Sequence, residues 1–238
     1  MFNFLSIYFR IAVFMALIPA LVLMFIIYKQ DKIESEPPSL LVKLSLLGGA
    51  MVVPAAFIET VFTGLLSIFV PDSYDFVYLY IENFIIIAIA EEGLKFLVLY
   101  LATWNNKNFN YRFDAVVYAV FVSLGFAAAE NIMYVLNLGI GIVPIRALTA
   151  IPIHCICGIF MGHNYALAKS CGRWNMDLRK IAYLLLGVFI PVLIHGFYDF
   201  SVSTYAGRLK LLFILFVLVL DFVAIKSVRS YAENDTKI

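Results

Sequence analysis

The sequence is poor in charged residues, and this scarcity limits what the protein can be. Only 14% of the 238 residues are charged and 63% are hydrophobic, with a mean hydropathy of +0.96. Soluble domains carry about 25% charged residues, so the composition excludes an ordinary soluble fold. An excess of positive charge is also missing, because 17 basic residues stand against 16 acidic ones. We therefore expect a lipid bilayer around the protein and no nucleic-acid partner.

Cysteines and linkers are equally scarce. The three cysteines, Cys155, Cys157 and Cys171, lack the number and spacing of a disulfide framework. The sequence shows no low-complexity segment and no internal repeat. Its first apolar run, residues 11–28, exceeds the core of a signal peptide and lacks a small-residue cleavage pattern, so we expect a retained span. These absences favour a single integral-membrane domain over residues 1–238.

Apolar runs of helical length make up most of the chain. A helix needs about 20 residues to cross the hydrocarbon core of a membrane. Seven such runs lie between polar breaks, at residues 8–28, 40–58, 76–103, 114–136, 144–168, 181–203 and 209–228. We therefore predict an all-α, polytopic membrane helix bundle with seven transmembrane helices. The stretch 59–70 is too short for a span, so it could be a re-entrant piece, an interfacial helix or the tail of a long second helix, and an eighth crossing stays open.

Basic residues are unevenly divided between the two sides of this predicted bundle. Short cytoplasmic loops concentrate Lys and Arg. One side holds eleven of them, namely Lys29, Lys32, Lys107, Arg112, Lys169, Arg173, Arg179, Lys180, Lys226, Arg229 and Lys237. The other side holds four, namely Arg10, Arg146, Arg208 and Lys210. We therefore expect the amino terminus outside the cell and the carboxyl terminus in the cytosol.

Charged residues inside the third predicted span are the first candidates for function. A charge at the bilayer centre costs at least about 2.5 kcal/mol, so such residues usually face the bundle interior. This span carries Glu91, Glu92 and Lys95. Their spacing lets Lys95 pair with one glutamate on a shared helix face and leaves the other glutamate free. A purely structural ion pair between helices would show the same pattern.

Two further spans add polar groups next to small residues. Glu130 follows Gly125 and a run of alanines, which lets a neighbouring helix approach closely. His154 shares one helical stripe with Gly158 and Gly162, which directs the imidazole into the bundle. Each signal alone would also suit an interior hydrogen bond.

The sixth span completes a set of metal-binding side chains. His195 and Asp199 lie one turn apart, as two metal ligands would, or as one ligand and the group that orients it. With Glu130 and His154 they suit a divalent metal, zinc, that keeps an open position for water. Such a metal lowers the pKa of its water to about 7, and a nearby glutamate can take the proton. The residues therefore predict hydrolytic chemistry.

Four motifs carry a family resemblance. They are EEGLK at 91–95, FAAAEN at 126–131, His154 in the following span and HGFYD at 195–199. Their order and spacing resemble the EExxK, FxxxE and HxxxD motifs of the PrsW family of intramembrane proteases, over residues 76–203. The related type II CAAX prenyl proteases and bacteriocin-immunity proteins have EExxxR, FxxxH and HxxxN instead.

The resemblance implies an endopeptidase of the bacterial cell membrane. It would make the first, extracytoplasmic-side cut in a membrane-anchored anti-sigma factor, a single-span protein, and so release an envelope-stress sigma factor. Carried onto this sequence, the catalytic residues are Glu91, Glu92 and Lys95. The remaining site residues, expected to bind the metal, are Glu130, His154, His195 and Asp199. Counted along the predicted spans, these groups lie nearer the outer surface, where the implied cut takes place.

The same buried residues are compatible with two other functions, and three further acidic residues lie outside the motifs. Buried Glu, His and Lys residues also build ion- or proton-coupled transporters, but the paired broken half-helices of transporter repeats are missing. A non-catalytic immunity or scaffold protein is the second alternative, which the intact motif acids disfavour. Glu59, Glu82 and Asp221 are interpreted as interfacial or helix-packing groups.

Overall fold

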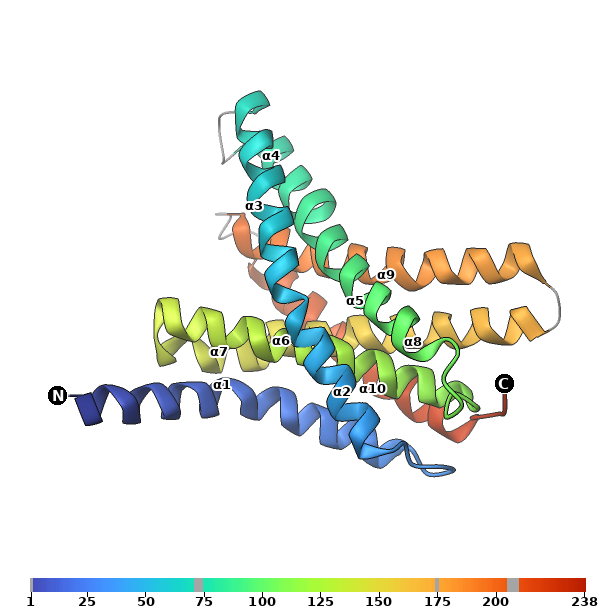
Figure 1. The fold of residues 1–238 in the computed structure, drawn as a ribbon. Helices are drawn as coiled ribbons and strands as arrows, with labels where there is room; N and C mark the ends of the chain where they lie inside the picture. Colours follow the sequence, from blue (N-terminus) through green and yellow to red (C-terminus); the bar gives the residue numbers. More distant parts are fainter. Residues whose placement is uncertain (1, 71–74, 174–175, 205–209) are drawn as a thin grey trace.

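The computed structural model describes residues 2–70, 75–173, 176–204 and 210–238, and their regular structure is helical (Figure 1). The elements are α1 (Phe2–Gln30), α2 (Pro38–Ala50), α3 (Val52–Phe69), α4 (Phe76–Tyr80), the π-helix η1 (Ile81–Ile87), α5 (Ala88–Thr103), α6 (Arg112–Leu138), the 3-10 turn η2 (Ile140–Ile142), α7 (Val143–Leu148), α8 (Ala150–Arg173), α9 (Asp177–Ser203) and α10 (Lys210–Glu233). The predicted all-α fold is confirmed for these residues.

Several helical stretches are long and apolar enough to cross a membrane. There are five among the described residues: Phe9–Gln30, Pro38–Phe69, Arg112–Leu138, Ile140–Gly172 and Asp177–Ser203. The protein is therefore an integral membrane protein, as its composition predicts. The count of seven spans stays a prediction, because the charge-rich stretch 76–103 and α10 are not among these five.

Some predicted boundaries change in the structure. The stretch 59–70 forms the end of α3, which continues α2 after a single turn, so it is the tail of a long second helix. The predicted span 144–168 is divided between α7 and α8, with η2 before them. Residues 71–74 and 205–209, around breaks between the predicted spans, lie outside the described residues, and Arg208 lies outside them too.

Helix α6 is the centre of the bundle and packs against α1, α2 and α8. Every side chain from residue 113 to residue 128 is buried, as expected for a helix that is apolar all round. Glycines allow α6 to pack closely against α2 on one side and against α8 on the other. Gly125 faces the backbone of Ser45 in α2, and Gly162 of α8 faces the backbone of Ala115. A larger side chain at either glycine would collide with this backbone, so the predicted small-residue contact faces are confirmed.

The segment that carries the glutamate pair is tilted away from the central helices. In Figure 1, α3 lies beside α4 and η1, and this group diverges from α6 and α7 on the side of the amino terminus. Near the point of divergence, Gly196 of α9 faces the ring of Phe84 in η1. The missing side chain at residue 196 lets α9 approach the tilted segment, and this contact brings His195 next to the start of α5.

Candidate active site

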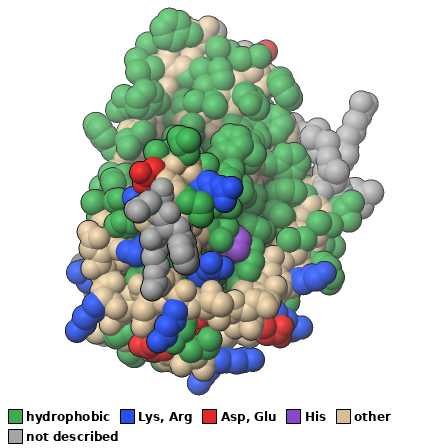
Figure 2. Space-filling model, turned by 90° about the vertical axis from the view of Figure 1, so that its right-hand side faces the viewer, with side chains coloured by type: hydrophobic (Ala, Val, Ile, Leu, Met, Phe, Trp, Pro, Cys, Tyr) green, Lys and Arg blue, Asp and Glu red, His purple; other side chains and the backbone are tan. Residues whose placement is uncertain are grey.

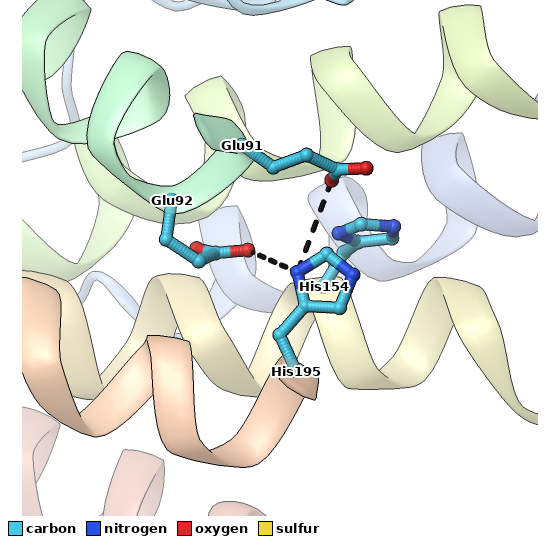
Figure 3. Close-up of side chains that lie close together, drawn as sticks. All are labelled: Glu91, Glu92, His154 and His195. Carbon is cyan, nitrogen blue, oxygen red and sulfur yellow. Dashed lines mark hydrogen bonds and ion pairs between the residues drawn. The ribbon is translucent and has the colours of Figure 1, made fainter. Parts of the chain in front are cut away.

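The ionisable residues of three helices meet at one place inside the bundle. Glu91 and Glu92 lie on α5, His154 on α8 and His195 on α9, and all four side chains are buried. Figure 3 shows them pointing toward one another. One ligand atom of each lies within 4.8 Å of those of the others. The fold therefore brings together side chains that sequence analysis places in three separate predicted spans.

Lys95 holds the two glutamates from within the same helix. Its Nζ lies 3.0 Å from Glu91 Oε2 and 2.8 Å from Glu92 Oε1. A third hydrogen bond runs from Nζ to His154 Nδ1 at 3.0 Å, which uses all three protons of the ammonium group. The side chain is fully buried, with Nζ 4.1 Å from the ring centre of Phe126. The expectation that one glutamate stays free of the lysine is wrong, because the ammonium reaches both.

In each histidine the outer nitrogen, meaning the Nε2 atom that points away from the glutamate pair, contacts a carboxylate. His154 accepts the lysine proton at Nδ1, so its Nε2 carries hydrogen and donates to Glu130 Oε2 at 3.0 Å. His195 Nε2 lies 3.1 Å from Asp199 Oδ2, and its Nδ1 lies 2.8 Å from Glu92 Oε1. Carboxylates in this position fix the tautomer and the orientation of metal-binding imidazoles.

This arrangement differs from the predicted ligand set in two members. Glu130 and Asp199, which the sequence predicts as metal ligands, both contact the outer nitrogens of the histidines. Glu130 is also bound by Arg146 of α7, whose Nη2 lies 2.8 Å from Glu130 Oε2. From the sequence, Arg146 is only one of the four basic residues on the predicted outer side. The signal that could have found it is its position within the fifth predicted apolar run, where a buried acid needs a counter-ion.

The donor atoms of the four grouped side chains fit a divalent metal of the zinc type. Imidazole nitrogens and carboxylate oxygens are common zinc ligands. Glu92 Oε2 is buried and has no hydrogen-bond partner among the described residues. The glutamate pair also carries more negative charge than the single ammonium of Lys95 balances. A divalent cation would satisfy both the orphaned oxygen and the excess charge.

A cleft of about 350 Å³ opens beside the cluster, lined by residues of α3, η1, α5, α6, α7, α8 and α9. Glu91 reaches the cleft, whereas Glu92 is not among its lining residues. Asn137 and Ser203, at the ends of α6 and α9, place the cleft on the side of the amino terminus (Figure 1). Glu59 also lines it, with a buried Oε1. The interpretation of Glu59 as an interfacial or helix-packing group stays a prediction, to which the structure adds a place in the wall of the cleft.

Comparison with known proteins agrees with this geometry. The family described as "PrsW family intramembrane metalloprotease" matches residues 36–225. "Protease PrsW" of Oceanobacillus iheyensis is 31% identical over 216 residues, which cover 91% of this chain and 94% of the relative. "Protease PrsW" of Clostridioides difficile is 31% identical over 229 residues, covering 94% and 92%. "Protease PrsW" of Bacillus subtilis is 31% identical over 189 residues, covering 78% and 79%.

No solved structure shows significant similarity to this chain. The assignment therefore depends on the sequence relatives and on the site that the fold builds. The family match includes the helices that carry the glutamate pair, both clustered histidines and the cleft-lining acids. This chain is an intramembrane protease and belongs to the PrsW family.

Proposed function

We propose that the protein is an endopeptidase that makes the first, extracytoplasmic-side cut in a membrane-anchored anti-sigma factor and so releases an envelope-stress sigma factor. The observation that carries the proposal is the meeting of two glutamates and two histidines beside a cleft at one end of the bundle. Family membership supports peptide hydrolysis, and the motif resemblance supports the class of substrate.

The proposed orientation puts the amino terminus outside and the carboxyl terminus in the cytosol. Figure 2 looks at the end of the molecule that holds the carboxyl terminus, and Lys and Arg side chains gather over its lower part. The positive-inside rule places such an end in the cytosol. The cleft lies toward the opposite end, so this orientation supports a cut at the outer surface.

The proposed metal-holding residues are Glu92, His154 and His195, and the two histidines would offer to the ion the Nδ1 atoms that face Lys95 and Glu92 in the structure. Glu130 and Asp199 keep the two imidazoles in place through the outer nitrogens. This assignment moves Glu130 and Asp199 from the predicted ligands to the groups that orient them. A zinc ion at this place would polarise a water molecule and lower its pKa to about 7.

Glu91 is the proposed general base, because it is the glutamate of the pair that reaches the cleft. Its carboxylate would take a proton from the attacking water and return it to the leaving amine of the cut peptide bond. Lys95 holds this carboxylate in place through the 3.0 Å contact with Oε2. A helical substrate hides its peptide bonds, so we expect the cut in a locally unwound or juxtamembrane stretch.

Proteoliposomes test this function directly. The purified protein would be reconstituted with a single-span substrate that carries different tags at its two ends. We expect cleavage near the outer end of the substrate span, mapped by mass spectrometry, and loss of cleavage in Glu92→Ala. Glu82→Ala is the matched control, because Glu82 lies on η1 and does not line the cleft. A cut on the cytosolic side, or ion flux without cleavage, would contradict the proposal.

The metal gives a separate prediction. Elemental analysis of the purified protein should find about one divalent ion per chain, and exhaustive chelation should remove both this ion and the cleavage activity. His195→Ala is expected to lose the ion. His163→Ala should keep it, because His163 stacks on Tyr231 at a ring distance of 4.0 Å and lies outside the cluster. Full activity in metal-free protein would show that the glutamates activate water directly.

A further inference from the structure

One face of α3 forms a wall of the cleft and carries a single charged residue. The lining residues of this helix are Val52, Ala55, Ala56 and Glu59, whose spacing is that of one helical face. The first three are apolar or small, and Glu59 follows them toward the outer end of α3. A peptide chain in the cleft would therefore contact an apolar wall that ends in a carboxylate.

The carboxylate of Glu59 is incompletely satisfied within the part of the chain that the structure describes. Its Oε1 is buried and has no hydrogen-bond partner there. No described lysine or arginine forms an ion pair with it, since the ion pairs involve Lys95 and Arg146 with other acids. A buried carboxylate oxygen without a donor is costly, so a donor from outside the chain would stabilise it.

The lysine and arginine side chains around the cleft and the cluster cannot supply this donor, because they are already engaged. The Arg146 guanidinium binds Glu130 at 2.8 Å and Asn131 at 2.9 Å, and lies 3.9 Å from the ring centre of Tyr134. The Lys95 ammonium makes three contacts inside the cluster. The charged and titratable groups close enough to act on Glu59 through space are Glu130, His195, Asp199 and Lys95.

The cleft as a whole is acidic. Its lining includes the carboxylates of Glu59, Glu91, Glu130 and Asp199, against Arg146 alone among lysines and arginines. A divalent cation in the cluster would reduce this charge without reversing it. Inside a cleft with low-dielectric walls, such a field attracts positively charged groups and repels negative ones.

We infer that Glu59 is a specificity-determining residue that pairs with a lysine or arginine side chain of the substrate close to the scissile bond. This inference rests on the proposed proteolytic function and names a feature of its substrate. Because the lysine or arginine would supply the donor that Glu59 Oε1 lacks, substrates without a basic residue at that position should be cleaved less efficiently.

A lysine scan of the substrate tests the inference. A single lysine is moved through the positions on both sides of the cut, and each substrate is compared with the same substrate carrying glutamine there. With the wild-type protein, one position should favour lysine by about tenfold in kcat/KM, as expected for a hydrogen bond to a charged group. In Glu59→Gln this ratio should fall to about one, and Glu59→Lys should prefer glutamate at the same position.

The control is Glu82→Gln, which makes the same chemical change outside the cleft and should keep the wild-type ratio. Equal lysine-to-glutamine ratios in the wild-type protein and Glu59→Gln at every position would overturn the inference. A wild-type protein that cleaves none of the substrates would instead contradict the proposed function, so the two failures are distinguishable.

Discussion

Glu91→Gln is expected to lower the kcat of peptide cleavage by about 10²- to 10⁴-fold, the usual contribution of a general base. Glutamine keeps the size of the side chain and an oxygen that can accept from Lys95, but it cannot take a proton from water. The substrate wall of the cleft stays intact, so KM should change little. Cleavage of a single-span substrate in proteoliposomes would measure both constants.

The metal content of the same variant separates two roles of Glu91. A general base can be removed while the ion stays bound, whereas a ligand cannot. We expect Glu91→Gln to keep its ion and Glu92→Gln to lose it, because only Glu92 is fully buried behind the cleft. Glu82→Gln again serves as the matched control. Cleavage by Glu91→Gln within tenfold of the wild-type rate would assign the base elsewhere, and loss of the ion would make Glu91 a ligand.

The residues that meet in the cluster could be predicted from sequence because the bilayer makes each of them costly. Glu91, Glu92, His154 and His195 stand in apolar runs where packing alone gives no reason for them. Helical periodicity further places Lys95 on the face of the glutamates. The structure then shows why the simple pairing was incomplete, since one ammonium contacts three acceptors.

The surroundings of Glu130 and Glu59 could not be predicted from the sequence, because they depend on turns and helix tilts. Glu130 meets Arg146 only because the chain turns after α6, at Gly139 with φ 83°, and brings α7 beside α6. A left-handed glycine is easy to recognise in a structure, but the direction in which it sends the chain is set by packing. Glu59 likewise lines the cleft because α3 packs against η1 and contributes one of the walls.

The position of Asp199, which contacts the outer nitrogen of His195, has the same origin. Sequence spacing shows that His195 and Asp199 share a helix face, and this is compatible with two ligands or with one ligand and its orienting group. The choice depends on which ring nitrogen faces the cluster. In the structure Nδ1 of His195 faces Glu92 and Nε2 faces Asp199, an orientation set by the approach of α9 to α5.

Lys95→Met is expected to lower the free energy of unfolding by about 3–5 kcal/mol, the usual cost of removing one partner from a buried charge network. Methionine keeps much of the apolar stem but leaves Glu91 and Glu92 without their shared cation. A native domain is stabilised by about 5–15 kcal/mol in total, so the loss would be a large part of its stability. Equilibrium unfolding of the purified protein in detergent, monitored by circular dichroism, would measure it.

Two variants decide whether this loss comes from the charge network. Lys43→Met removes a lysine from an exposed position on α2 and should change stability by less than about 0.5 kcal/mol. Glu91→Gln combined with Lys95→Met removes one of the two stranded charges, so the double variant should be more stable than Lys95→Met alone. The difference reports the coupling between the two residues. Strictly additive effects would show that Lys95 contributes packing and not charge, and the shared role of its ammonium would have to be abandoned.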